Sequence, residues 1–255
     1  MAYFIDNLRN NFDFWLRNPL SRKNYYEKSE DLSDIFENEK EERFYTNLKE
    51  KYGSQLGENT TSRIFLENLY FINIFDKFLT KNQKEKISIL DVGSKNWSYV
   101  KSEYLFFNSF AKNFILNGIE LDAYRLSSKF YTRFEIAKFY TKDLSNTNYI
   151  AGDFLEHNQK YDYIIWILPF ITQYPLVKWG LPLRYFRPKE MLEHAYNLLN
   201  ENGELLIINQ GEEEYEIQQN LYKELNLSFT PLGEIEDFYK LFKNKRYCSK
   251  IYKGI

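Results

Sequence analysis

The chain has 255 residues, with 34 basic and 36 acidic side chains and a formal net charge of -2. This balance excludes a general electrostatic attraction to nucleic acid or to an anionic membrane surface. A single cysteine, Cys248, excludes a disulfide framework within the chain, and two histidines make a zinc site improbable. No uncharged apolar run reaches the roughly 18 residues of a membrane-spanning helix. We therefore expect a cytoplasmic protein with no bound metal and no membrane partner.

The first 84 residues are predicted to form three helices before any strand. Apolar side chains recur at helical spacing between Tyr3 and Leu16, again between Phe36 and Leu48, and a third time in SRIFLENLYFINIFDKFL. Aromatic helices without strands of their own are unlikely to fold alone, so we expect an appendage on one domain. It is either a structural cover or a lid over a ligand site.

The first predicted strand and the loop after it carry a nucleotide-binding pattern. The stretch KISILDVGSKNW is a short apolar run that Asp91, Gly93 and Ser94 interrupt. Such a run is typical of a strand buried on both faces, and a glycine turn before a helix lets a ligand approach free backbone amides. The usual loop has two or three glycines, whereas Lys95 and Trp97 follow the single glycine here.

Two further strands are predicted to deliver carboxylates to the same edge of the sheet. The strand FILNGIELD ends in Glu120, Leu121 and Asp122, and a third strand is followed by Asp153 and Phe154. A carboxylate at the end of the second strand can accept hydrogen bonds from both vicinal hydroxyls of a ribose. The alternative is a solvated carboxylate at a strand end, and the first loop favours the ribose role.

The rest of the chain alternates helices and strands, as an α/β fold requires. Helices are predicted over residues 97–112 and 123–140 and after Pro188, and strands over 161–168 and in GELLIIN. The link between the third and fourth strands is too short for a full crossover helix. The last two strands, LSFTPLGEIEDFY and RYCSKIYK, read as a hairpin. The basic residues after Tyr239 either contact phosphates or protect a sheet edge, and the edge role is favoured.

The order and spacing of these signals resemble the class I S-adenosylmethionine-dependent methyltransferase family. ILDVGS resembles its first motif, IELD its acidic second-strand motif, GDF its third-strand adenine motif, YDYIIWILPF its fourth strand, and LLNENGELLIIN the next helix, turn and strand. The resemblance covers about residues 85–255. It implies an α/β fold with a Rossmann-like, mostly parallel seven-stranded sheet and a C-terminal antiparallel hairpin. Residues 1–84 would add an N-terminal helical extension to this methyltransferase domain.

The resemblance also implies a cofactor, S-adenosyl-L-methionine, and the residues that bind it. Asp91 and Gly93 would lie beneath its methionine part, with Ser94 contributing at the turn. Lys95 is placed to pair with the cofactor carboxylate. Glu120 would bind the ribose hydroxyls.

The third-strand motif implies the adenine contacts. Asp153 would accept a hydrogen bond from the exocyclic amine, and Phe154 would pack against the ring. The full set of expected cofactor-binding residues is Asp91, Gly93, Ser94, Lys95, Glu120, Leu121, Asp153 and Phe154.

The acceptor pocket is expected at the end of the fourth strand and in the segment ITQYPLVKWGLPLRYF. The tripeptide LPF resembles the N-P-P-F motif of amino-group methyltransferases but lacks its first polar residue, so neither nitrogen methylation nor a catalytic residue is assigned. Aromatic and arginine side chains here either bind a planar or anionic acceptor or serve packing. The candidate substrate residues are Trp166, Pro169, Phe170, Trp179 and Arg184.

The expected function is methyl transfer from S-adenosylmethionine to an unidentified acceptor. The balanced charge mildly favours a small molecule over nucleic acid or protein as that acceptor. A catalytically inactive, methyltransferase-like binding or scaffold module is the alternative, because the loop has one glycine and the fourth strand lacks the polar residue. A nicotinamide-dependent oxidoreductase is disfavoured, since the pyrophosphate fingerprint is absent.

Overall fold

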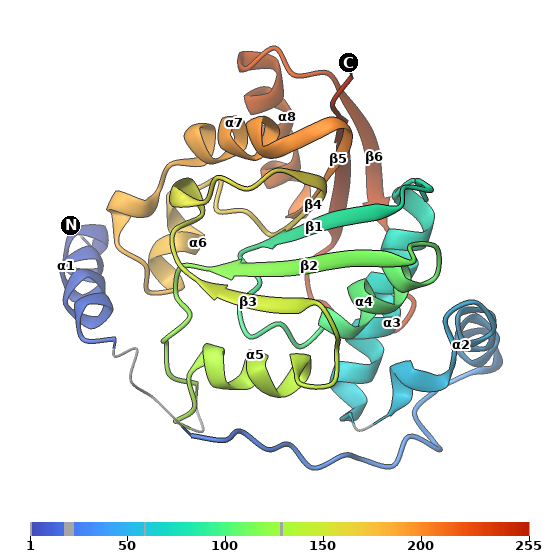
Figure 1. Ribbon diagram of the computed structural model, residues 1–255. Coiled ribbons are helices and arrows are strands. Elements are labelled where there is room, and N and C mark those ends of the chain that lie inside the picture. The colour runs from blue at the N-terminus through green and yellow to red at the C-terminus, as the bar shows by residue number, and fades with distance from the viewer. Residues whose placement is uncertain (1, 18–22, 59, 128–129, 255) are drawn as a thin grey trace.

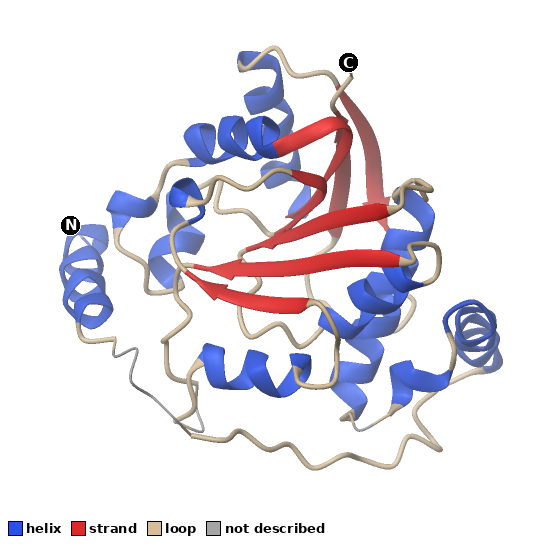
Figure 2. Cartoon of the chain, in the orientation of Figure 1, coloured by secondary structure: helices blue, strands red, loops and turns tan. Residues whose placement is uncertain are grey.

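The computed structural model describes residues 2–17, 23–58, 60–127 and 130–254, and within them a seven-stranded sheet is covered by helices on both faces (Figure 1; Figure 2). The strands are β1 (Lys86–Val92), β2 (Asn113–Glu120), β3 (Thr147–Ala151), β4 (Tyr161–Ile167), β5 (Leu199–Gln210), β6 (Phe229–Ile235) and β7 (Arg246–Tyr252). Their order is β3-β2-β1-β4-β5-β7-β6. The first five are parallel, and β7 runs antiparallel to both β5 and β6. The predicted sheet and its terminal hairpin are confirmed.

Eight α-helices and three short 3-10 turns connect the strands in the described part of the chain. The helices are α1 (Ala2–Trp15), α2 (Glu39–Tyr52), α3 (Ser62–Phe78), α4 (Val100–Asn108), α5 (Arg133–Thr141), α6 (Gln173–Lys178), α7 (Pro188–Leu198) and α8 (Gly211–Glu224), and the turns are η1 (Ser54–Gly57), η2 (Phe154–Glu156) and η3 (Leu183–Tyr185). Only η2 lies between β3 and β4, as the short link predicted. No described helix has the length and apolar character to cross a bilayer.

The central strand β4 is buried along nearly its whole length because both faces of the sheet are covered there. On β4, Tyr163 and Ile165 belong to the core shared with α3 and α4. Their neighbours Ile164 and Trp166 belong to the core shared with α7 and α8. Alternate side chains of one strand therefore enter opposite cores, which is the arrangement typical of a parallel sheet.

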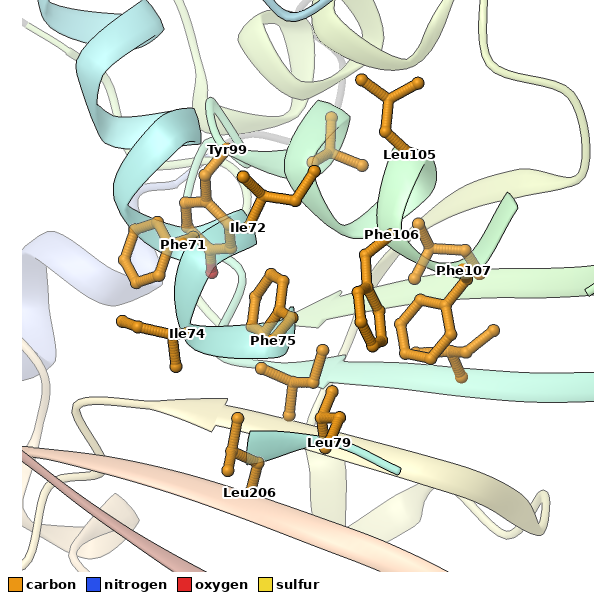
Figure 3. Close-up of a cluster of buried hydrophobic side chains, with 14 of the residues drawn as sticks. Phe71, Ile72, Ile74, Phe75, Leu79, Tyr99, Leu105, Phe106, Phe107 and Leu206 are labelled. Atoms are coloured by element: carbon orange, nitrogen blue, oxygen red, sulfur yellow. The ribbon is translucent and has the colours of Figure 1, made fainter. Parts of the chain in front are cut away.

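Helix α3 packs into the main core, although it precedes the sheet in sequence. Figure 3 shows Phe71 and Phe75 of α3 in one cluster with Phe106 of α4 and Leu206 of β5. The rings of Phe75 and Phe106 have centres 6.0 Å apart. The predicted domain division at residue 84 stays a prediction, but the side chains of α3 lie in the same core as the sheet.

Helix α1 is docked through its polar side, which the helical periodicity alone does not indicate. It lies beside α6, far from α2 (Figure 1). The Asn10 amide donates to the carbonyls of Val177 and Leu181, at 2.9 and 3.2 Å. The apolar stripe faces outward instead, with Phe4 66% and Trp15 78% exposed. The predicted helix is therefore present, with its apolar stripe on the exposed side.

The helix predicted over 123–140 begins ten residues later than expected, so that prediction is wrong in its first half. Thr132 caps α5 by accepting from the Glu135 amide, and the Glu135 carboxylate accepts from the Thr132 amide in return. This capping box starts the helix at a defined residue. Leu126 and Phe130, which the predicted helix would include, lie in the preceding loop and are 57% and 69% exposed.

Candidate functional site

A cavity of about 400 Å³ opens at the carboxyl ends of the parallel strands. Gly93 after β1 and Leu168 and Pro169 after β4 lie on its wall. The strands β1 and β4 are adjacent in the sheet. The strands that follow β1 in the sequence, β2 and β3, lie on one side of this pair, and β5 lies on the other side. Ligands of open α/β sheets bind at such a switch point, and the volume is within the range of small-molecule sites.

Ten of the thirteen residues predicted for the cofactor or the acceptor line this one cavity. They are Gly93, Lys95, Glu120, Leu121, Asp153, Phe154, Trp166, Pro169, Phe170 and Trp179. Asp91 and Ser94 do not line it, because both side chains are fully buried behind the wall. Arg184 also lies off the wall, since its guanidinium donates to Asn11 of α1.

The loop after β1 adopts left-handed backbone at alternate residues although only one is glycine. The φ angles are +74° at Gly93, +56° at Lys95 and +50° at Trp97. A left-handed conformation costs a non-glycine residue about 1 kcal/mol or more, so the surrounding contacts must hold it. The loop therefore turns as a glycine-rich loop would, with side chains at two of the three positions.

Trp97 does not obstruct the cavity, because its ring is buried on the other side of the loop. The side chain is 0% exposed, and its indole nitrogen donates to Glu103 at 2.9 Å. The ring lies against Gly118 of β2, where an added Cβ would come within 2.9 Å of two indole carbons and of the Ser94 hydroxyl. Gly118 thus provides the space that the tryptophan fills.

Replacing Gly118 with alanine is expected to destabilise the fold by about 1–3 kcal/mol, because the added methyl overpacks a rigid ring. Gly152→Ala is the matched control, since its Cβ would meet nothing within 4 Å and its φ is not positive. Urea unfolding of both variants measures the difference. Equal stability of the two variants would show that Trp97 can move away from β2.

Lys95 and Trp179 close the cavity above this loop. The Lys95 ammonium lies 5.1 Å from the centre of the Trp179 ring, a cation–π distance. The backbone amide of Lys95 donates to Glu120, which lines the same cavity, at 2.8 Å. Lys95, which stands where the usual loop has a glycine, therefore contributes both its ammonium charge and its backbone amide to the site.

Glu120 lies at the centre of the site with its carboxylate held by several donors. One oxygen accepts from the Lys95 amide, and the other accepts from the Asp122 amide at 2.7 Å and from Arg133 at 3.2 Å. Only 7% of the residue is exposed. Two carboxylate oxygens have about four acceptor positions between them, so acceptor capacity remains for a ligand.

Asp122 ties the N-terminal segment to the rim of the cavity. Its carboxylate is fully buried and pairs with Arg17, just beyond α1, and with Arg125 and Arg133. Burial raises the pKa of Asp122 to about 6 despite these cations. Arg17 also donates to the carbonyl of Gly180 at 3.0 Å. The residues around α1 therefore bind both the end of β2 and the segment after α6.

Asp153 and Phe154 form the wall after β3. One oxygen of Asp153 accepts from the Leu155 amide at 3.0 Å, and the other accepts from Arg187 at 2.6 Å. Phe154 is buried against Trp166, with ring centres 6.2 Å apart. The Asp153 carboxylate and the Phe154 ring are thus neighbours on the wall, and the carboxylate forms an ion pair with Arg187.

Behind the wall, Asp91 and Glu103 form a buried acidic pair. Asp91 accepts from the Tyr99 hydroxyl at 2.7 Å, and Tyr99 is the member that lines the cavity. The two carboxyl groups interact with each other, and each has one oxygen without another donor among the described residues. A proton shared between them would satisfy both oxygens. Burial raises the pKa of Asp91 to about 7 and that of Glu103 well above its usual range.

The sequence patterns missed the wall that α3 and β7 provide. Arg63, Glu67, Tyr70 and Phe71 of α3 line the cavity, and so does Arg246 at the start of β7. The signal was weak: Arg63 and Glu67 are charged residues four apart in the first half of a mostly apolar helix. Among the residues that the structure describes, no group of three or more acids, histidines or cysteines is arranged to hold a metal.

Comparisons with known proteins agree with this architecture. No family model and no curated protein matches the sequence. The structure is similar to a Listeria monocytogenes protein assigned to the class I S-adenosylmethionine-dependent methyltransferases, with 13% identity, a TM-score of 0.51, and 84% of this chain and 68% of that chain covered. An Aquifex aeolicus S-adenosylmethionine-dependent methyltransferase has 14% identity, a TM-score of 0.48, and coverage of 82% and 96%.

A third similar structure is the magnesium protoporphyrin IX methyltransferase of Synechocystis, solved with bound S-adenosylmethionine. It has 11% identity, a TM-score of 0.46, and coverage of 100% of this chain and 98% of that chain. Identities this low bear on the fold alone. With the observed strand order, the antiparallel end of the sheet and the likeness to the Listeria protein, the chain has the fold of the class I S-adenosylmethionine-dependent methyltransferases.

Proposed function

We propose that this chain transfers a methyl group from S-adenosylmethionine to a small-molecule acceptor in the cytoplasm. The observation that carries the proposal is the placement of Glu120 and Asp153. These two carboxylates end neighbouring strands, β2 and β3, and line one cavity at the switch point of the sheet. They stand where a bound nucleoside would present its ribose hydroxyls and its base.

The residues present fit the nucleoside part of this cofactor. Glu120 would accept from one ribose hydroxyl through the acceptor position that its three protein donors leave free, and from the second in place of Arg133. Asp153 would accept from the adenine amine, and Phe154 would pack on the ring. Arg187 either shares the Asp153 carboxylate with the base or moves aside, because its Nε has no partner among the described residues.

The methionine part would lie beside Gly93, with Lys95 and Tyr99 next to it. Lys95 has no ion pair to a described carboxylate and is therefore available to the carboxylate of an amino acid. Asp91, expected to act at the cofactor itself, would act through the Tyr99 hydroxyl that it orients. Asp91 is therefore proposed as a positioning residue.

When bound, S-adenosylmethionine supplies an already activated methyl group, so the protein has little covalent chemistry to perform. Its tasks are to align the acceptor and to exclude water. Pro169, Phe170 and Trp179 give the cavity an apolar wall next to the polar cofactor contacts. The Lys95 ammonium over the Trp179 ring holds that wall against the loop.

The test is transfer of a labelled methyl group. The full chain is incubated with S-adenosylmethionine labelled on its methyl, together with the small-molecule fraction and, separately, the macromolecular fraction of a cell extract. Label is expected in a small molecule, and Glu120→Ala should abolish it.

One alternative is a binding or scaffold module without turnover. It is favoured because Glu120 and Asp153 already form ion pairs with Arg133 and Arg187. It predicts a different outcome in the same assay. Tight cofactor binding with no labelled product in either fraction would support the scaffold and contradict the enzyme.

A further inference from the structure

Three cationic side chains on the cavity wall lack an ion pair with any described carboxylate. They are Arg63 of α3, Lys95 after β1 and Arg246 of β7. The other two arginines of the wall, Arg133 and Arg187, form ion pairs with acids of the same wall. On the side of the cavity formed by α3 and β7, the guanidinium groups of Arg63 and Arg246 therefore stand outside any ion pair, although Glu67 and Glu214 line the same side.

Arg63 and Arg246 converge on one ring, that of Phe242, from opposite ends of the sequence. The guanidinium carbons lie 5.4 Å and 4.8 Å from the ring centre. Arg63 donates to the carbonyl of Leu241 at 2.8 Å, and Arg246 donates to the Gln210 side chain at 2.6 Å. A guanidinium has five N–H donors, so each arginine keeps donors for a ligand.

The hydroxyl of Tyr70 adds a neutral donor at the same place. The Tyr70 ring centre is 5.0 Å from that of Phe242, and the residue is 3% exposed. Its hydroxyl has no hydrogen-bond partner in the described part of the chain. An unpartnered buried hydroxyl is costly, and an anionic oxygen in the adjoining cavity would relieve that cost.

The acidic residues nearby each accept a hydrogen bond from a neutral donor, and the second oxygen of Asp237 is buried with no partner in the described chain. Glu67 accepts from the Ser98 hydroxyl at 3.0 Å. Glu214 accepts from the Gln210 amide at 3.1 Å, and Asp237 accepts from the Phe242 amide at 2.9 Å. None of the three forms an ion pair with Arg63 or Arg246 within the described chain. The two guanidiniums thus have local acids but no direct acidic contact.

The sheet order separates this cationic end from the proposed nucleoside contacts. Glu120 ends β2 and Arg246 begins β7, with β1, β4 and β5 between them. Four strand spacings amount to roughly 19 Å along the sheet. Lys95 lies on the Glu120 side, where its amide bonds that carboxylate. We therefore leave Lys95 to the cofactor and consider Arg63 and Arg246 as a separate subsite.

We propose that this end of the cavity is an anion subsite in which Arg63, Arg246 and the Tyr70 hydroxyl hold a carboxylate or phosphate group of the methyl acceptor. The proposal rests on the proposed function, since it places a methyl acceptor in this cavity. The acceptor is a small acid, because the subsite is part of a cavity of about 400 Å³, at whose rim Arg63 is exposed. The rings of Phe71 and Phe242 on the same wall suit an apolar body attached to the acid.

The experiment compares charged and neutral ligands of one shape. Benzoate, phenyl phosphate and neutral benzamide are titrated into the full chain saturated with S-adenosylhomocysteine, and ligand-observed NMR gives their dissociation constants. The anions are expected to bind at least about tenfold more tightly than benzamide, because charge-assisted hydrogen bonds form only with them. The ratio between benzoate and phenyl phosphate then distinguishes a carboxylate from a phosphate acceptor.

Two variants locate the effect. Arg246→Gln should weaken anion binding about tenfold, and Tyr70→Phe about threefold, with benzamide unchanged. Arg184→Gln is the matched control, because Arg184 is exposed and does not line the cavity. If Arg246→Gln fails to fold, Arg63→Gln on the exposed side of α3 provides the same test.

Three results would overturn the proposal. The first is anion binding no tighter than that of benzamide, and the second is anion binding that survives both arginine substitutions. The third is a tenfold loss of S-adenosylhomocysteine binding in Arg246→Gln, which would assign the guanidinium to the cofactor. Calorimetry of the wild type with S-adenosylhomocysteine alone tests the proposed function separately. Anion binding without nucleoside binding would overturn the acceptor assignment and retain an anion site.

Discussion

Glu120→Ala is expected to weaken binding of S-adenosylhomocysteine about 100-fold. The substitution removes the acceptor of two ribose hydroxyls, and hydrogen bonds to a charged group contribute about 1.5–3 kcal/mol each. It also removes the acceptor for the amides of Lys95 and Asp122, which hold the loop against β2. Isothermal titration calorimetry on the wild type and the variant gives the ratio of dissociation constants.

Two controls separate lost contact from lost fold. Glu120→Gln keeps the shape and one acceptor, and about a tenfold loss is expected from it. Glu156→Ala removes an exposed carboxylate next to the site that does not line the cavity, so its binding should equal that of the wild type. A folded Glu120→Ala variant with unchanged affinity would show that the ribose lies elsewhere.

The second large effect is expected in the pH dependence of stability, from Asp91 and Glu103. Folding raises the pKa of both groups, to about 7 for Asp91 and well above the usual range for Glu103. The folded state therefore binds more protons than the unfolded state once the unfolded carboxyls ionise. The contribution of this pair to the free energy of unfolding is fully present at about pH 4 and is lost as the pH rises toward 7 and beyond. The loss is at most about 1.4 kcal/mol per pH unit for each proton.

Glu103→Gln should flatten this curve. The amide donates to Asp91 without a titrating proton and still accepts from the Trp97 indole, so one proton no longer enters the folding equilibrium. The free energy of urea unfolding, measured from pH 5 to 8, should shift in favour of the variant as the pH rises. Contributions of Asp122 and His157 are common to both proteins and cancel in the difference.

Glu212→Gln in the exposed first turn of α8 is the control and should give a curve parallel to the wild type. A Glu103→Gln curve that also runs parallel would mean that Asp91 and Glu103 share no proton. The Tyr99 hydroxyl would then be the only donor to Asp91, and the role of Asp91 behind the cavity wall would need another explanation.

The strand ends were predictable because their chemistry is local in sequence. Glu120 and Asp153 each follow a short apolar run, and parallel strands bring their carboxyl ends to one edge. The same reasoning placed Phe154 on the cavity wall. Where a residue's position follows from strand order alone, the sequence was sufficient.

The direction of side chains in the first loop could not be read from the residues. Lys95 and Trp97 have similar φ angles, yet Lys95 lines the cavity and Trp97 is buried. What decides between them is Gly118 on the neighbouring strand, which leaves space for the indole. Nothing within the loop itself indicates that packing partner.

The cationic end of the cavity depends on contacts between distant parts of the chain. Arg63 and Arg246 meet at Phe242 only because α3 packs beside β7 and the preceding loop. The placement of helix α1 also depends on contacts with a distant part of the chain. Its apolar periodicity predicts a helix, but hydrogen bonds from Asn10 to the segment after α6 decide which side is covered.

Calorimetric titration of the wild-type chain with S-adenosylhomocysteine, with NAD as the comparison ligand, tests the central claim most directly. We expect one S-adenosylhomocysteine molecule to bind per chain with a dissociation constant in the micromolar range, and NAD to give no binding heat. No heat from S-adenosylhomocysteine at millimolar concentration, or binding of NAD in its place, would contradict the assignment of this cavity to a methyl donor.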